Sequence, residues 1–200
     1  QPAQPGKRLS DKEIFQQLLV DLQASGGRAD AVLRRFGTEV RDLPEHLLRA
    51  VRTGTPRLLG KLAPVITRFG DAAVGEEIHY QMQVRRLGEA TRPLLKAMVQ
   101  ILGPSATDRL FDLVFAKSPM VRREAVDALT ERVQAAELQR IESLTQERDR
   151  SLQLAGIKLM GHVRHDDARA RLVELLSDRA TVAAAAVRSL LPHGQDAVVP

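Results

Sequence analysis

Hydrophobic residues recur along this chain at intervals of three and four, in short segments that end at glycine or at another turn-forming residue. This spacing places the apolar side chains on one face of an amphipathic helix. The segments come in pairs, from SDKEIFQQLLVDLQAS at residues 10–25 to ATVAAAAVRSLLPHG at residues 180–194. No segment alternates with a period of two for long, so the pattern predicts paired helices and no β-sheet.

The ends of these segments also repeat along the chain. Phe36-Gly37, Phe69-Gly70 and Leu102-Gly103 are spaced 33 residues apart, and Leu129, Met160 and Leu191 are spaced 31 apart. A period of about 30 to 35 residues with two amphipathic segments per unit is typical of an α-solenoid. We therefore predict an all-α fold, an α-solenoid of about six antiparallel helix pairs, with helix in more than about 60% of residues.

The period breaks once, at the shorter step from Leu102 to Leu129. This break predicts two halves: divergent helical repeats over residues 10–104 and more regular repeats over residues 105–194. Residues 1–9 are expected to be a Pro/Gln linker, and residues 195–200 a tail or the continuation of a longer chain.

Several local signals predict where helices begin and end. Ser10 and Glu13 have the spacing of a capping box, which starts the first helix. Gly26-Gly27 is expected to end that helix, and Gly37 to end the next one. Pro64 is expected to kink or shorten its helix, because proline removes a backbone donor.

Composition excludes several classes of function. The chain has no cysteine, which rules out disulfides, thiolate catalysis and Cys-based zinc sites, and which fits the cytoplasmic location that we expect. No run approaches the roughly 18 apolar residues of a membrane-spanning helix. Aromatic residues make up only 3% of the chain, so the core must consist mainly of aliphatic side chains.

The later repeats resemble a known family. SPMVRREAVDAL, DRSLQLAGIKLMG and DRATVAAAAVRSL are similar to the HEAT-like repeats of the phycobilisome-lyase type. The resemblance is good over about residues 105–194 and loose over residues 10–104. It implies the solenoid fold; the family includes bilin lyases, a DNA glycosylase branch and many scaffolds in bacterial signalling proteins. The glycosylase branch depends on aromatic residues, and this chain has no Trp and one Tyr.

Two polar clusters were considered as metal sites. His162 and His165 precede Asp166 and Asp167, and both imidazole and carboxylate bind metals. This cluster lies at an expected turn between helices, where Asp is a common N-cap, so a solvated turn is the better interpretation. Glu76 and His79 form only half of a di-iron motif, without a second copy. We expect no metal, no cofactor and no catalytic centre.

The clearest pattern outside the expected core is a pair of cation ladders. Arg109, Arg140 and Arg171 are spaced 31 residues apart, as are Lys117, Arg148 and Arg179. Members of the first ladder each lie near the expected start of the second helix of a repeat, and equal spacing aligns them on one face at about 10 Å per repeat. The first ladder is a candidate interaction stripe and the second a secondary candidate.

Two explanations for the ladders remain open. Arg109 and Arg171 each have an acid three residues later, which would make a local helix-surface pair. Cations of the second ladder suit the negative end of a helix dipole. Repeat consensus alone would therefore also produce periodic cations.

The net charge is +5, and it lies entirely in residues 1–100. We expect a non-catalytic scaffold that presents one curved face to a protein partner with an acidic surface or segment. The alternative is a nucleic-acid-binding module that contacts the phosphates of a duplex. A lyase or glycosylase relative is the remote alternative.

Overall fold

The structure is a computed structural model of the 200-residue chain, and it describes residues 9–24 and 29–195. The fold is all-α: 82% of the described residues are helical, and none of them lies in a strand. The prediction of more than about 60% helix is therefore confirmed. The chain divides into two compact units, Gln1–Ala106 and Thr107–Pro200, which are described separately below.

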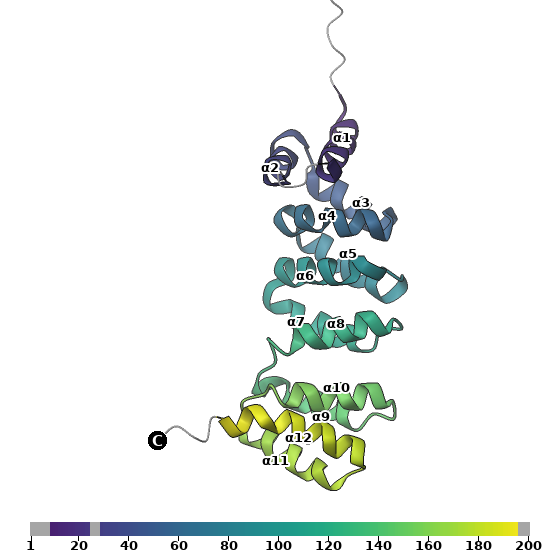
Figure 1. Cartoon of the computed structure of the whole chain (residues 1–200). Helices are drawn as coiled ribbons and strands as arrows, with labels where there is room; N and C mark the ends of the chain where they lie inside the picture. The colour runs from purple at the N-terminus through teal and green to yellow at the C-terminus, as the bar shows by residue number, and fades with distance from the viewer. Residues whose placement is uncertain (1–8, 25–28, 196–200) are drawn as a thin grey trace, which may run out of the picture. The chain divides into compact units, whose positions relative to one another are not determined.

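The first unit contains three successive helix pairs (Figure 1). They are α1 (Asp11–Ala24) with α2 (Ala29–Glu39), α3 (Leu43–Thr53) with α4 (Pro56–Phe69), and α5 (Ala72–Val84) with α6 (Thr91–Leu102). Corresponding helices of consecutive pairs pack on each other, α3 on α5 and α4 on α6. This is the contact pattern of a helical repeat, in which each pair covers the next.

The second unit repeats the arrangement. Its pairs are α7 (Ala106–Val114) with α8 (Pro119–Leu129), α9 (Leu138–Thr145) with α10 (Arg150–Met160), and α11 (Asp166–Glu174) with α12 (Ala180–Gln195). The second helix of the middle pair, α10, packs against α8 on one side and α12 on the other. The all-α solenoid prediction is confirmed at the level of these repeated pairs.

Polar side chains set the starts of many helices. The cap oxygen accepts a hydrogen bond from a backbone N–H of the first turn, which has no partner inside the helix. Side-chain caps of this kind are Thr55 for α4, Asp71 for α5, Ser118 for α8 and Asp149 for α10. The capping box at Ser10 is confirmed, because the Ser10 N–H donates to Glu13 Oε2 at 2.8 Å and the Glu13 N–H donates to Ser10 Oγ at 3.3 Å.

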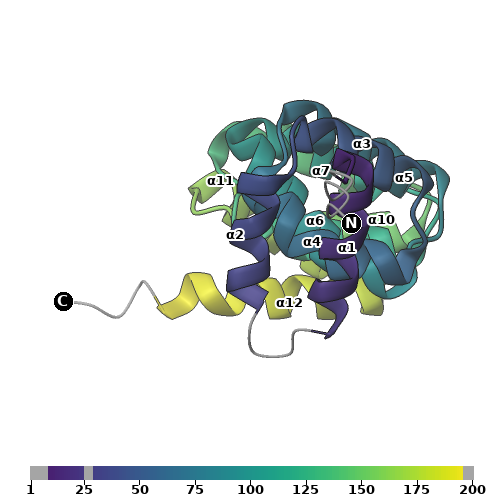
Figure 2. The same cartoon turned by 90° about the horizontal axis from the view of Figure 1, so that it is seen from above.

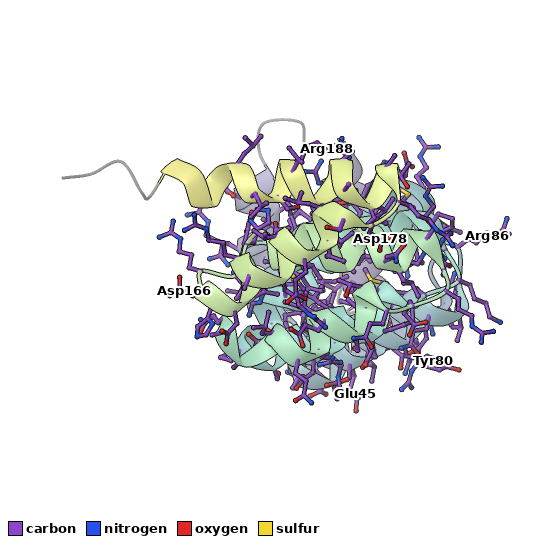
Figure 3. The ribbon with its side chains drawn as sticks, turned by 90° about the horizontal axis from the view of Figure 1, so that it is seen from below. Glu45, Tyr80, Arg86, Asp166, Asp178 and Arg188 are labelled. Carbon is purple, nitrogen blue, oxygen red and sulfur yellow. The ribbon has the colours of Figure 1, made fainter. Side chains whose placement is uncertain are left out.

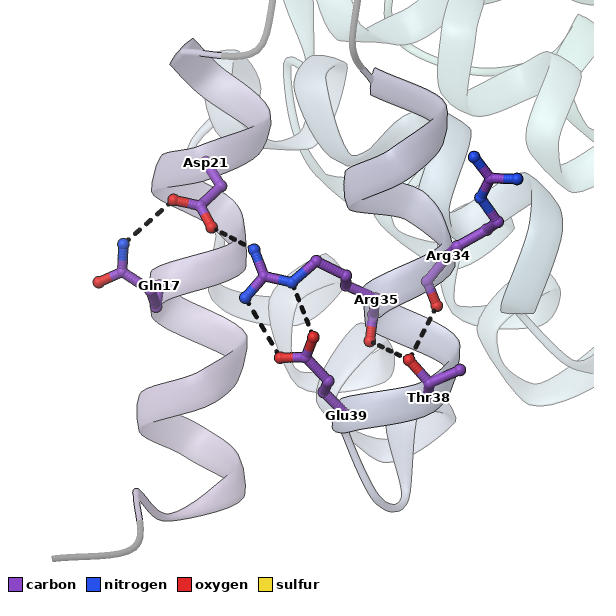
Figure 4. Close-up of polar contacts among 6 residues, drawn as sticks. All are labelled: Gln17, Asp21, Arg34, Arg35, Thr38 and Glu39. Carbon is purple, nitrogen blue, oxygen red and sulfur yellow. Dashed lines mark hydrogen bonds and ion pairs between the residues drawn. The ribbon is translucent and has the colours of Figure 1, made fainter. Parts of the chain in front are cut away.

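An ion-pair cluster joins α1 to α2, the two helices that lie side by side in Figure 2. The Arg35 guanidinium donates to Asp21 of α1 at 2.8 Å and to Glu39 of its own helix at 2.7 Å (Figure 4). The hydrogen bond from Arg35 lowers the pKa of Glu39 below its ordinary value. The cluster is solvent-exposed, so it orients the two helices more than it stabilises them.

The core is aliphatic, as the composition predicts. Leu129 and Leu159 are fully buried, and the buried aromatic rings are Phe15, Phe36 and Phe111. Three methionines, Met82, Met98 and Met160, are also buried and fill the core. Leu191 differs from the earlier members of its series: it is 66% exposed and lies inside α12, which continues to Gln195. No later helix pair packs over this position within the described residues.

Two predicted helix boundaries were wrong. Gly37 lies inside α2, and a Cβ there would come within 2.7 Å of the Phe69 ring, so this glycine permits close packing and does not end the helix. Pro64 does not shorten α4, which continues to Phe69, and the alternative that it kinks the helix stays a prediction. Pro64 is on the exposed face, where water can satisfy the carbonyl that the proline leaves without a donor.

The other predicted boundaries are confirmed, lie outside the described residues or stay predictions. Gly70 and Gly103 do cap α4 and α6, and Gly103 adopts φ 56°, a value that favours glycine. Gly26-Gly27 lies outside the described residues, as does nearly all of the expected linker and tail. The proposed division into residues 10–104 and 105–194 stays a prediction.

Candidate interaction surface

The first cation ladder lies on corresponding helices of the second unit. Arg109 is in α7, Arg140 in α9 and Arg171 in α11, the first helix of each pair and not the second as expected. The three side chains are similarly half-exposed, at 39%, 42% and 43%. They therefore occupy equivalent positions on three successive helices.

Carboxylates accompany every arginine of this ladder. Arg140 reaches back to the preceding pair, with Nη1 at 2.9 Å from Asp108 Oδ1 and Nη2 at 3.6 Å from Asp112 Oδ1. Arg171 does the same, with Nε at 3.5 Å from Glu142 Oε1. The remaining pairs are Arg109 with Asp112 and Arg171 with Glu174, and hydrogen bonding to Glu174 raises the pKa of Arg171.

These contacts surround the arginines of the first-helix face with a slightly larger number of carboxylates. Three arginines alternate with four carboxylates, so an approaching anion would meet a slight excess of negative charge. The ion pairs connect neighbouring helix pairs, which gives the arginines a structural role. Whether they also contact a partner stays a prediction.

The second ladder lies in turns. Lys117, Arg148 and Arg179 directly precede the cap or first residue of α8, α10 and α12, in the turns that follow the first helices. All three residues are exposed, and no carboxylate of the described chain forms an ion pair with their side chains. These cations are therefore available to a partner, although no contact shown here tests that role.

A groove lies on the second helices of this unit. Its first hollow, about 310 Å³, lies between α8 and α10. Apolar side chains form most of its surface, among them Val126 and Leu154, and Arg123, Asp127 and Lys158 add charged groups. Lys158 Nζ is 2.5 Å from Asp127 Oδ1, so an ion pair bridges the two helices beside this hollow.

A second hollow of about 370 Å³ lies on the other side of α10, against α12. Leu154 and Lys158 line both hollows, so the two lie next to each other on either side of α10, and together we call them the groove of α8, α10 and α12. Arg188 of α12, labelled in Figure 3, adds an exposed cation at the second hollow. Gly161 allows α10 to approach α12 closely, because a Cβ there would meet Ser189 at 2.7 Å.

The groove follows the same 31-residue period as the ladders, a signal that the sequence analysis missed. Arg123, Leu154 and Ala185 occupy one repeated position, and Asp127, Lys158 and Ser189 another. Both sets face the groove. The chemical types change from repeat to repeat, so a search for recurring cations does not find them.

The polar clusters considered as metal sites have local structural roles. His165 is the N-cap of α11, where an aspartate was expected: its Nδ1 accepts a hydrogen bond from the Asp167 N–H at 3.3 Å. His79 lies on α5 with its Nε2 3.1 Å from the Gln83 amide nitrogen. Within residues 9–24 and 29–195, no group of three or more potential ligands gathers around a metal position.

The described helices also include none with the combined length and apolar character needed to cross a membrane.

Comparison with known proteins adds little. No protein-family model and no curated protein matches this chain. Among solved structures, a designed armadillo repeat protein in complex with peptide (KR)4 is similar, at 11% sequence identity and a TM-score of 0.40, over 87% of this chain and 97% of that one. A likeness this distant does not indicate what this chain binds.

Proposed function

We propose that this chain is a non-catalytic helical-repeat scaffold that binds a segment of another protein in the groove formed by α8, α10 and α12. The observation that carries this proposal is that two largely apolar hollows lie next to each other and share Leu154 and Lys158. Surface hollows with apolar linings and a few charged groups are typical of binding sites for side chains.

The helices supply a mechanism for binding. Each apolar side chain of a partner that fills a hollow gains on the order of 1.5–3 kcal/mol from removal of its surface from water. The groove residues lie on helices held by buried cores, so little conformational entropy is lost on the scaffold's side. The partner supplies the apolar side chains that fill the hollows, and the spacing of the repeated helices fixes the distance between those side chains.

We extend the proposal to the type of repeat and its setting. The strings at residues 118–129, 149–161 and 178–190 support a HEAT-like repeat of the phycobilisome-lyase type in a bacterial protein. The absence of cysteine fits a cytoplasmic location.

A peptide-display selection on the purified chain tests the groove. Peptides selected from a random library would be titrated against wild type, Ala155→Phe and Ala170→Phe. Ala155 lines the first hollow, whereas Ala170 is exposed on α11. We expect Ala155→Phe to weaken binding at least about tenfold, because the ring fills the hollow, and Ala170→Phe to have no effect. Unchanged binding by a correctly folded Ala155→Phe variant would contradict the proposal.

Nucleic-acid binding is the second candidate function, favoured by the unpaired cations Lys117, Arg148 and Arg179 and by the net charge of +5. It predicts affinity for a DNA duplex that falls steeply with salt. Replacing all three cations by Gln would then make the logarithm of the affinity fall less steeply with the logarithm of the salt concentration, by the equivalent of about three phosphate contacts. A salt-independent or absent duplex affinity would exclude it.

A further inference from the structure

We propose that the groove of α8, α10 and α12 recognises an acidic segment that carries two apolar side chains about 10 Å apart, with Lys158 exchanging its partner Asp127 for a carboxylate of that segment. This inference rests on the proposed function and specifies the chemistry of the partner.

The charge of the groove favours an acidic occupant. Its lining includes four cations, Arg122, Arg123, Lys158 and Arg188, against the single carboxylate Asp127. The first-helix face has the opposite balance, with Arg109, Arg140 and Arg171 outnumbered by their carboxylates. An acidic segment is therefore attracted to the groove and not to the arginine ladder.

The cations of the groove differ in how firmly they are held. Arg122 donates to the carbonyls of Ala116 and Lys117 at the end of α7, so its position is fixed. Arg123 is 67% exposed and pairs only distantly with Glu124, at 3.7 Å. Arg188 is exposed, and its side chain has no ion pair with any described residue. Arg123 and Arg188 can thus turn toward a ligand without breaking the fold.

Lys158 is the central cation, because it lines both hollows. Its ion pair with Asp127 is solvent-exposed, with both side chains at 49%. Exposed pairs are weak and exchange readily with other partners. A carboxylate bound between the hollows would replace Asp127 as the partner of Lys158, and Asp127 would then oppose binding by its own negative charge.

The spacing of the helices sets the distance between the two apolar side chains of the bound segment. The hollows flank α10, and neighbouring packed helices lie about 8–10 Å apart. Two apolar side chains that fill both hollows must be separated by a similar distance. A segment in the polyproline II conformation achieves this with side chains three positions apart, because three residues complete one turn at a rise of about 3.1 Å per residue.

The inference is tested with labelled synthetic peptides of about twelve residues, each with two leucines three positions apart, which lie on one face of a polyproline II segment. Glutamates fill the flanking positions of the first peptide, glutamines those of the second and lysines those of the third; a fourth keeps the glutamates and replaces both leucines by serine. We expect the acidic dileucine peptide to bind at least about tenfold more tightly than each of the other three.

Substitutions in the groove separate partner exchange from a purely structural ion pair. Lys158→Gln and Arg188→Gln should each weaken the acidic peptide severalfold, whereas Asp127→Asn should tighten it severalfold. Arg169→Gln on α11 serves as the matched control, because Arg169 is exposed and away from the groove. A structural ion pair alone predicts no gain from Asp127→Asn.

The outcomes distinguish this inference from the proposed function. If peptides selected by display require the groove but are neutral or basic, the acidic-segment inference is overturned and the scaffold function stands. If the acidic peptide binds and Ala155→Phe leaves its affinity unchanged, the groove itself is not the site. Equal binding of the Glu, Gln and Lys peptides, or no effect of Asp127→Asn, also overturns the inference.

Discussion

The guanidinium of Arg140 in α9 lies over the ring of Phe111 in α7, 4.2 Å from its centre. Phe111 is almost fully buried, so this arginine of one helix pair covers an aromatic core residue of the preceding pair. The same guanidinium forms ion pairs with Asp108 and Asp112, which lie on the same helix as Phe111. A cation that looks like part of a binding stripe in the sequence therefore also joins two repeats.

Arg140→Ala should lower the free energy of unfolding by about 1–2 kcal/mol, through loss of the cation–π contact and two exposed ion pairs. Arg169→Ala on α11 should be nearly silent, because its side chain is exposed and makes no ion pair or cation–π contact with the described residues. Denaturant unfolding of both variants checks the comparison. Equal stabilities would show that the contact with Phe111 contributes nothing.

Gly156→Ala should destabilise the chain by about 1–3 kcal/mol, because a Cβ there would come within 2.9 Å of Leu144 and of the Thr145 backbone nitrogen. Gly60 in α4 provides the contrast, since a Cβ there would meet nothing closer than 3.9 Å. Gly60→Ala should therefore be neutral or stabilise by up to about 1 kcal/mol through helix propensity. Melting temperatures that shift equally in both variants would argue against the close approach of α10 to α9.

Arg85 caps α3 from the adjacent pair. Its guanidinium donates to the backbone carbonyls of Val51, Arg52 and Gly54, at 3.3, 3.1 and 2.8 Å. Arg85→Ala should cost about 1–3 kcal/mol, because these helix-end carbonyls lose a charged donor. The neighbouring Arg86 is exposed without such contacts, so Arg86→Ala is the control and should unfold like wild type.

Glu77 makes stability depend on pH. Burial pushes its pKa up, but hydrogen bonds from Gln81 and Arg52 together bring the pKa below the ordinary value of 4.5. A carboxyl with a lowered folded-state pKa stabilises the fold above its unfolded pKa, and this contribution disappears as pH falls through the folded pKa. The stability advantage of wild type over Glu77→Gln should thus be full at about pH 7 and shrink below about pH 4.5. A difference that stays constant down to about pH 3 would contradict the assigned pKa shift.

The helices were largely predictable because their signals are local. Apolar spacing and caps such as Asp71 and Ser118 act within a few residues, so sequence and structure agree on the pairs. Gly37 and Pro64 were misjudged because the outcome depends on distant residues: Phe69 needs the space at Gly37, and exposure makes Pro64 tolerable.

The surface was less predictable for the same reason. Periodicity located Arg140 and Arg171, but not the carboxylates of the preceding helices that pair with them. The groove combines apolar Leu154 with the cations Arg123 and Arg188, so no single chemical type identifies it in the sequence. Only the packing of α8, α10 and α12 brings them together, and a repeat period does not say which helix face stays open.

The central claim is that the second helices, and not the first, form the binding face. Methyl-labelled NMR spectra of the chain, titrated with the acidic dileucine peptide, test it most directly. The account predicts that signals of Val126 and Leu154, which line the groove, shift in proportion to bound peptide. Signals of Val173, which is exposed on α11, should not move. Shifts confined to α7, α9 and α11 would contradict the account and place the partner on the face of Arg109, Arg140 and Arg171.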